Sequence, residues 1–134
     1  MGKASSAVYN INYHVVWCPK YRKPVLTGKI KEFLEEQIET IAETKGYKIL
    51  EKRVMPDHVH LFLEANPFDS PINIVKVFKG VSSLRISKRF PELREQMWRG
   101  VLWSPSYYVG TAGHVSAELI ERYIKEQERY SSTG

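Results

Sequence analysis

Residues 47–65, YKILEKRVMPDHVHLFLEA, are the most informative part of this sequence. The segments 47–55 and 58–65 carry the apolar and β-branched residues typical of strands, and Pro56 and Asp57 between them are typical of a tight turn. We therefore predict two antiparallel strands joined by a short turn.

The second of these strands separates its side chains into an apolar face and a mixed face. Successive side chains of a strand point to opposite sides, so alternate positions share a face. The apolar set predicts the face that helices cover. The mixed set contains two histidines, which stand side by side on the open face with Cα atoms about 6–7 Å apart. The apolar set is Val59, Leu61 and Leu63, and the mixed set is His58, His60, Phe62 and Glu64.

Two helices flank the strand pair. The first is predicted over 28–45, where apolar residues recur at helical spacing, and Gly46 follows it at a position that favours glycine. The second begins at Pro71 after Ser70, a pair typical of helix starts, and is predicted to end near Arg89.

The outer segments complete the order of elements. Residues 8–17 and 101–109 are predicted to form the first and fourth strands, with a short helical turn over 91–98. The order β-α-β-β-α-β predicts an α+β fold, a ferredoxin-like antiparallel sheet with the two internal helices on one face.

A last helix is predicted over 114–131, after Gly110 and Gly113. Glycines constrain the backbone weakly, so we expect this C-terminal helix to be mobile and to dock on its own sheet or on that of a partner. The chain is interpreted as a single domain over 1–134, with a body of sheet and helices over 1–109.

The composition is that of a soluble globular chain. Its 134 residues are 43% hydrophobic and 26% charged, which excludes a disordered or collagenous protein. No apolar run approaches the roughly 18–20 residues of a membrane span, and residues 1–17 lack the apolar core and small-residue cleavage site of a secretory signal. Cys18 is the only cysteine, which excludes an intrachain disulfide and a cysteine-based zinc site. We expect a cytoplasmic protein without membrane contact.

Basic residues outnumber acidic ones, 20 to 15, and they gather in two segments. Basic and aromatic residues are interleaved in WCPKYRK and in MWRGVLW, as in surfaces that bind phosphates and stack bases. A solvated rim would carry the same residues, so nucleic-acid binding and a bland surface both stay open. The two basic segments contribute Lys20, Arg22 and Lys23, and Lys76, Lys79, Arg85, Lys88 and Arg89.

The histidine pair suits two ligands of one metal ion, with a third ligand to come from another element. Two partly exposed strand histidines without any ligand role would show the same pattern. The His-x-His spacing alone therefore leaves both interpretations open.

Five segments in a fixed order resemble a known family: YHVVWCPKYRKPVL, VMPDHVHLFLE, FKGVSSLRI, LWSPSYYVGTAG and YIKEQ. Together they are similar to the HUH single-tyrosine transposases, small insertion-sequence transposases that act on single-stranded DNA. The HUH triplet is His58-Val59-His60, and the resemblance covers nearly the whole chain. It implies the same ferredoxin-like fold and a nucleoid-associated enzyme that cleaves and rejoins DNA at insertion-sequence ends.

The resemblance assigns roles to two residues of the last helix. Tyr123 and Gln127 are four residues apart, so they share a helix face. By resemblance, Tyr123 is the nucleophile that forms a 5′-phosphotyrosine and leaves a free 3′-OH, and Gln127 completes a metal site with His58 and His60. We expect Mg²⁺ or Mn²⁺, with Mn²⁺ the better match for imidazole ligands, and no nucleotide cofactor. Without the resemblance Tyr123 is interpreted as a core residue.

Three residues near this site keep open roles. Asp57 either caps the turn or orients a histidine. Glu64 lies on the same strand face as the two histidines, so its side chain can point toward the site. His114 opens the last helix as a cap, a DNA contact or a proton carrier.

The resemblance also implies partners. Family members recognise hairpins that form in single-stranded DNA near the ends of the element. They work as homodimers in which one subunit supplies the histidines of a site and the other supplies the tyrosine. We expect such composite sites in trans, with sites complete within one chain as the alternative.

Two other function classes stay open, a non-catalytic ferredoxin-like nucleic-acid-binding protein and a metal-dependent nuclease without a covalent intermediate. The expected DNA contacts are Lys20, Arg22, Lys23, Lys79 and Arg85.

Overall fold

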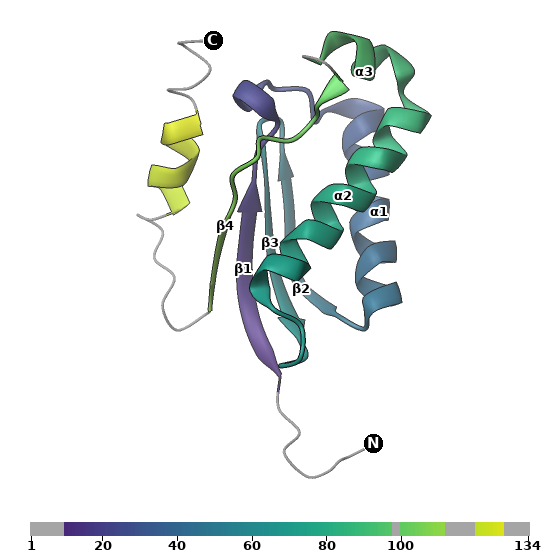
Figure 1. Cartoon of the computed structure of the whole chain (residues 1–134). Helices are drawn as coiled ribbons and strands as arrows, with labels where there is room; N and C mark the ends of the chain where they lie inside the picture. Colours follow the sequence, from purple (N-terminus) through teal and green to yellow (C-terminus); the bar gives the residue numbers. More distant parts are fainter. Residues whose placement is uncertain (1–9, 98–99, 112–119, 128–134) are drawn as a thin grey trace.

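The chain folds around a four-stranded antiparallel sheet (Figure 1). A computed structural model describes residues 10–97, 100–111 and 120–127. The strands lie in the order β2-β3-β1-β4, so β3 and β1 are central. The predicted α+β class with an antiparallel sheet is confirmed. The bounds are Ile11–Trp17 for β1, Lys48–Met55 for β2, His58–Ala65 for β3 and Tyr108–Thr111 for β4.

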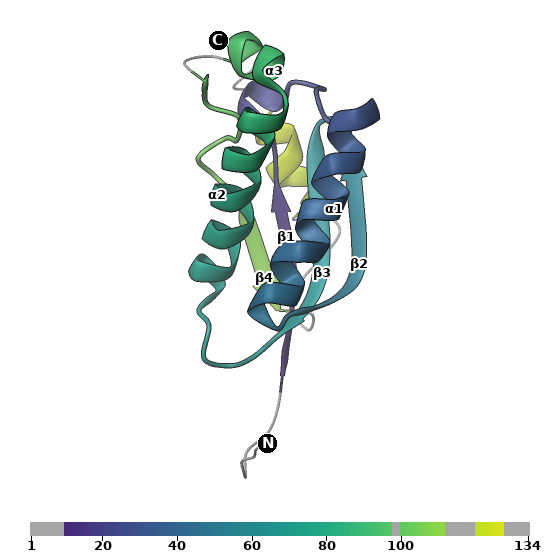
Figure 2. The same ribbon diagram turned by 90° about the vertical axis from the view of Figure 1, so that its right-hand side faces the viewer.

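Helices α1 and α2 cover one face of this sheet, as Figures 1 and 2 show from two directions. Residues 120–127 are helical and lie on the opposite face in both views. Within the described ranges, no helix combines the length and the hydropathy needed to cross a membrane. The bounds are Gly28–Lys45 for α1, Pro71–Arg89 for α2, Pro91–Gln96 for α3 and Lys20–Arg22 for the short 3-10 helix η1.

The boundaries of the two long helices follow from their end residues. Gly46 ends α1 with a φ of 78°, a left-handed conformation that glycine adopts without steric cost. The Ser70 side chain accepts a hydrogen bond from the N–H of Asn73 at 3.1 Å and so caps α2. The helices predicted over 28–45 and from residue 71 to about 89 are both confirmed.

The segment predicted as the fourth strand is a loop over most of its length. β4 begins only at Tyr108, and before it Trp103 forms an isolated bridge with Pro19. The Trp103 side chain is only 5% exposed, so the apolar residues of this loop reflect burial rather than strand pairing. The prediction of a strand over 101–109 is therefore wrong for 101–107.

Gly110 also lies elsewhere than predicted. It pairs with His14 inside β4, so it belongs to the sheet and not to a joint before the last helix. Its carbonyl and N–H therefore lie in a paired strand, which restricts the backbone there. Parts of the predicted elements lie outside the described residues, namely 8–9, 98, Gly113 with 114–119, and 128–131.

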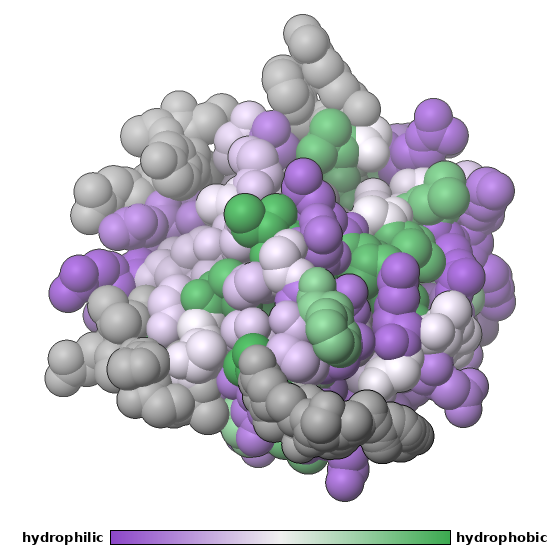
Figure 3. Space-filling model, turned by 60° about the horizontal axis from the view of Figure 1, so that its bottom comes forward, coloured by the Kyte–Doolittle hydropathy of each residue, from purple (hydrophilic) through white to green (hydrophobic). Residues whose placement is uncertain are grey.

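The core lies between the sheet and the helices α1 and α2. Trp17 of β1 is fully buried, with its ring 6.2 Å from Phe78 of α2 and 5.8 Å from Trp103 in an edge-on contact. Figure 3 shows the lower end of the molecule, where apolar groups are separated by hydrophilic ones. The apolar side of β3 thus rests on a packed interior, which leaves its other side for ligands.

Candidate functional site

His58 and His60 lie on the open face of β3, as the alternation of the strand predicts. Val59 between them is fully buried, whereas both histidines are partly exposed. His60 lies opposite Val16 of the neighbouring central strand. The histidines therefore share the sheet face on which residues 120–127 lie (Figures 1 and 2).

Two charged side chains orient His58. Its Nδ1 lies 2.9 Å from Oδ1 of Asp57, and Nε of Arg22 donates to Oδ2 of Asp57 at 2.6 Å. Burial would raise the pKa of Asp57, but hydrogen bonds from His58 and Arg22 outweigh it and hold this pKa below its ordinary value. A carboxylate only accepts hydrogen bonds, so Nδ1 of His58 is the donor in this pair. Asp57 therefore orients His58, one of the two roles that the sequence left open.

His60 is bound to another histidine. Nδ1 of His14 lies 3.0 Å from Nε2 of His60, and the His14 ring stacks on Phe62 with centroids 4.3 Å apart. Burial lowers the pKa of both histidines, which favours neutral rings that share one hydrogen bond. The prediction missed His14. Alternation in β1 is the signal that finds it, because the buried Tyr13 and Val15 leave His14 on the open face.

Tyr123 and Gln127 contact the loop that precedes β4. The Tyr123 hydroxyl donates to the main-chain oxygen of Ser106 at 3.2 Å and accepts from Ser106 Oγ at 3.4 Å. Burial raises the pKa of Tyr123 above its ordinary value. Gln127 is 5% exposed, and its Oε1 accepts from Ser104 Oγ at 2.9 Å. Among the described residues, no hydrogen bond joins either side chain to the histidines of β3.

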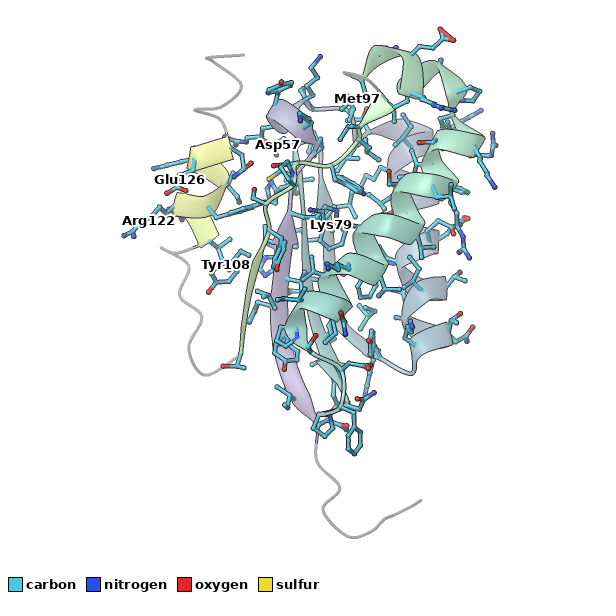
Figure 4. All side chains as sticks on the ribbon, viewed as in Figure 1. Asp57, Lys79, Met97, Tyr108, Arg122 and Glu126 are labelled. Atoms are coloured by element: carbon cyan, nitrogen blue, oxygen red, sulfur yellow. The ribbon has the colours of Figure 1, made fainter. Side chains whose placement is uncertain are left out.

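The helical residues 120–127 turn opposite sides to solvent and to the protein. Arg122 and Glu126 are exposed and point away from the sheet in Figure 4. Tyr123 is partly buried and Gln127 is buried. The spacing of four residues thus places the two predicted site residues together on the protein-facing side.

Lys79 of α2 holds residues 104–106, which we call the serine loop. Its Nζ donates to the carbonyl oxygen of Ser104 at 2.7 Å and to that of Ser106 at 3.2 Å. Figure 4 shows Lys79 pointing from α2 toward the segment that leads into β4. Burial lowers the pKa of Lys79. No sequence pattern marks the two serines, because their contacts depend on the loop conformation and on two distant helices.

The other predicted DNA contacts lie in two regions. In η1, Nζ of Lys20 lies 5.6 Å from the centre of the Tyr21 ring, and Lys23 next to η1 is exposed. In the helix layer, Nη1 of Arg85 donates to Oε1 of Gln37 at 2.7 Å. The structure therefore brings Arg22 of η1 into contact with Asp57 and leaves Arg85 on the helix-covered side of the sheet.

Glu64 shares the histidine face but lies at the other end of β3. It pairs with Asn12 of β1 and with Lys48 of β2. Glu64 lies six positions along the strand from His58, a span of about 20 Å. His114 lies outside the described residues.

Two imidazoles of β3 and the pair Tyr123 and Gln127 of the last helix therefore lie on the same face of the sheet. Within 10–97, 100–111 and 120–127, no three histidine, cysteine, aspartate or glutamate side chains gather as in a metal site. A ligand set of two histidines and one amide does not need such a group. Imidazole, amide oxygen and phenol together are suited to phosphate chemistry assisted by a divalent ion.

Several known proteins are similar in sequence to this chain over most of its length. Residues 7–127 match the family described as transposase IS200 like. The chain is 39% identical over 127 residues to the ISDra2 transposase TnpA of Deinococcus radiodurans, covering 95% of this chain and 91% of that relative. It is 34% identical over 126 residues to the transposase for insertion sequence element IS200 of Salmonella typhimurium, covering 94% and 82%.

Two solved structures resemble the fold of this chain. A crystal structure of a candidate transposase from Deinococcus radiodurans R1 has a TM-score of 0.86 at 38% identity, over 95% of this chain and 98% of that chain. A REP-associated tyrosine transposase bound to a REP hairpin has a TM-score of 0.52 at 13% identity, over 92% and 68%, which is a likeness of fold. The family match and the two relatives above 30% identity lead to one assignment. This chain belongs to the IS200-like transposases, a family of DNA-transferring enzymes.

Proposed function

We propose that this transposase cleaves and rejoins single-stranded DNA at insertion-sequence ends through a covalent 5′-phosphotyrosine at Tyr123. The observation that carries the proposal is a shared face: the oriented histidines of β3 and the helix with Tyr123 and Gln127 lie on the same side of the sheet. The relative that binds a REP hairpin supports hairpin DNA as the ligand. The order of elements and strands supports a ferredoxin-like fold of the HUH type.

The residues present fit a divalent metal ion. The carboxylate of Asp57 accepts from Nδ1 of His58, which leaves Nε2 as the ring nitrogen that can face a metal ion. His60 offers Nε2 once its bond with His14 is exchanged, and Oε1 of Gln127 has a second lone pair beside its bond from Ser104. We propose His58, His60 and Gln127 as ligands of Mg²⁺ or Mn²⁺. When bound, the ion polarises a phosphate oxygen and orients the phosphate.

Tyr123 supplies the nucleophile in this mechanism. Its hydroxyl stays protonated while it donates to Ser106, so it becomes reactive when it leaves that carbonyl and loses its proton. Attack forms a bond between the Tyr123 oxygen and phosphorus and breaks the bond to the 3′-oxygen, which takes up a proton. The phosphotyrosine conserves the energy of the phosphodiester, so a second 3′-OH can reverse the step and join a new strand.

We further propose a homodimer in which Tyr123 and Gln127 of one chain serve His58 and His60 of the other. The hydrogen bonds from the last helix to the serine loop support a site that is completed by movement of a helix, from the same chain or from a partner. Lys20, Arg22, Lys23, Lys79 and Arg85 are the proposed DNA contacts.

One experiment separates this mechanism from a metal-dependent nuclease. End-labelled single-stranded DNA carrying an insertion-sequence end is incubated with Mn²⁺ and wild-type protein, Tyr123→Phe or Tyr107→Phe, and resolved on a denaturing gel. We expect a protein-DNA adduct from the wild type and from the Tyr107→Phe control, and none from Tyr123→Phe. A chelator should remove the adduct. Cleavage without any adduct would instead establish the nuclease.

A further inference from the structure

A pocket of about 260 Å³ opens beside the C-terminal helix, and the mechanism above gives no role to the pocket itself, although Gln127 and Lys20 are among its lining residues. Sites for drug-sized ligands typically measure about 300–1,000 Å³, so this one suits a smaller group. Its walls come from η1, the serine loop and the last helix. It is lined by Lys20, Tyr21, Ser104, Pro105, Ser106 and Gln127.

We propose that this pocket binds one unpaired nucleotide of the DNA strand, adjacent to the phosphate that Tyr123 attacks. The inference rests on the proposed activity on single-stranded DNA and adds a nucleotide site to it. The lining supplies what a nucleotide requires. Tyr21 offers an aromatic ring for stacking, Lys20 offers a cation for phosphate, and the serines and Gln127 offer hydrogen-bonding groups.

The backbone of η1 holds Tyr21 in an uncommon conformation. Tyr21 has φ 60° and Arg22 has φ 52°, so two successive residues other than glycine are left-handed. Such strain persists where surrounding bonds impose it, and it is frequent at ligand sites. Here the N–H of Lys20 donates to the Leu102 carbonyl at 2.8 Å, and the N–H of Arg22 donates to the Pro19 carbonyl at 2.8 Å. The ring of Tyr21 is therefore presented by a constrained turn.

The position of the pocket ties it to the cleavage centre. Arg22, the residue after Tyr21, binds Asp57, which in turn orients His58. Figure 4 shows Asp57 at the same end of the sheet as η1. Gln127 lines the pocket itself, one helical turn from Tyr123. A nucleotide in the pocket would thus neighbour a phosphate held at the histidines.

Gln127 brings a buried hydrogen-bonding group to this pocket. Its side chain is 5% exposed, and its Oε1 accepts from Ser104. Its amide also carries an N–H₂ group with two donor hydrogens. An amide N–H₂ beside an aromatic ring recognises acceptors on a base edge, whereas a purely apolar wall would not.

The test is an abasic scan of a single-stranded oligonucleotide whose cleaved phosphate has been mapped by adduct formation. Affinity is measured by fluorescence anisotropy with metal-free protein in the Tyr123→Phe background, so binding is separated from cleavage. We expect one position next to the cleaved phosphate where loss of the base weakens binding about tenfold. Tyr21→Asn should weaken binding of the intact strand to the same extent and abolish this position effect.

The variants are chosen to spare the fold. Asparagine tolerates a left-handed backbone, so Tyr21→Asn removes the ring with little disturbance of η1. Tyr21→Phe keeps the ring and should bind like the wild type. Phe68→Ala removes an aromatic ring that is 92% exposed beyond the opposite end of β3, and it should leave affinity unchanged.

A second measurement does not depend on any variant. Photo-crosslinking of wild-type protein to strands with 5-iodouracil at single positions should yield one strong crosslink to Tyr21, from the position found by the abasic scan. A flat scan, an unaffected Tyr21→Asn variant or a crosslink elsewhere would overturn the pocket, while adduct formation would still support the proposed function. Absence of both adduct and strand binding would overturn both.

Discussion

Lys79 and Tyr123 donate hydrogen bonds to the same acceptor, the main-chain oxygen of Ser106, each at 3.2 Å. Lys79 approaches from α2 and Tyr123 from the C-terminal helix, so one carbonyl connects the two sides of the sheet. Ser104 repeats this link, since its carbonyl accepts from Lys79 at 2.7 Å and its hydroxyl donates to Gln127 at 2.9 Å. A single lysine therefore positions the loop that binds both proposed site residues of the last helix.

Replacing Lys79 with methionine should loosen the C-terminal helix. Two carbonyls of the serine loop lose their charged donor, so hydrogen exchange in residues 120–127 should rise. Adduct formation should fall about tenfold to a hundredfold, because the nucleophile is no longer positioned. Lys76→Met, on an exposed position of the same helix, is the matched control and should change neither quantity. Equal exchange in wild type and Lys79→Met would contradict this role.

Alanine at either histidine of β3 should abolish Mn²⁺ binding and adduct formation but preserve the fold. His58 and His60 lie on the open face, so the packed interior stays intact. Val59→Ala should show the reverse, a loss of about 1–3 kcal/mol in the free energy of unfolding with metal binding kept, because Val59 is fully buried. Urea unfolding and metal titration of each variant make the comparison. Normal adduct formation by both histidine variants would refute the assigned metal site.

Asp57→Asn should lower the affinity for Mn²⁺ about 10–100-fold, the usual effect of losing a carboxylate behind a metal-binding histidine. The amide neither fixes the His58 tautomer as firmly nor pairs with the charge of Arg22. Calorimetric titration of DNA-free protein measures this change. Glu64→Gln removes a carboxylate from the same strand face at the other end of β3 and serves as the control. A similar loss in both variants would point to general electrostatics instead.

The surroundings of Tyr47 lead us to expect a loss of stability at high pH. Burial and the hydrogen bond to Asp69 at 2.7 Å raise its pKa above the ordinary value. An unfolded tyrosine ionises near pH 10, so the unfolded chain releases this proton first, and stability falls as the pH rises through about 10. Tyr47→Phe should be about 1–3 kcal/mol less stable at pH 8. It should also lose less stability between about pH 8 and pH 10.5 than the wild type does.

Urea unfolding of both proteins at the two pH values provides this measurement. The raised pKa of Tyr123 adds the same pH dependence to both proteins, so only their difference reports on Tyr47. Parallel losses in the wild type and in Tyr47→Phe would show that folding does not raise the pKa of Tyr47.

Mixing two inactive proteins tests whether sites are composite. One carries His58→Ala with His60→Ala, and the other carries Tyr123→Phe. If sites form in trans, a heterodimer contains one site with intact histidines and tyrosine, so the mixture should regain adduct formation after subunit exchange. If each site is complete within one chain, the mixture stays inactive. A heterodimer isolated with two affinity tags ensures that exchange has occurred.

The sequence by itself determined the features that depend on local rules. The helices over 28–45 and 71–89 follow from apolar spacing and from the end residues Gly46 and Ser70. The placement of His58 and His60 on the open face follows from alternation along one strand. These inferences hold because backbone geometry sets side-chain direction over a few residues, whatever the rest of the chain does.

Only the tertiary structure decided the contacts between distant segments. The bond of His14 to His60 depends on strand register, and the bonds of Lys79 to the serine loop join residues 25 and 27 positions apart. The same holds for the loop over 101–107, where burial of Trp103 produced an apolar pattern that imitates a strand. Local periodicity indicates which side chains are buried, but it does not identify the residues that they contact. Those contacts are determined only when distant segments of the chain pack together.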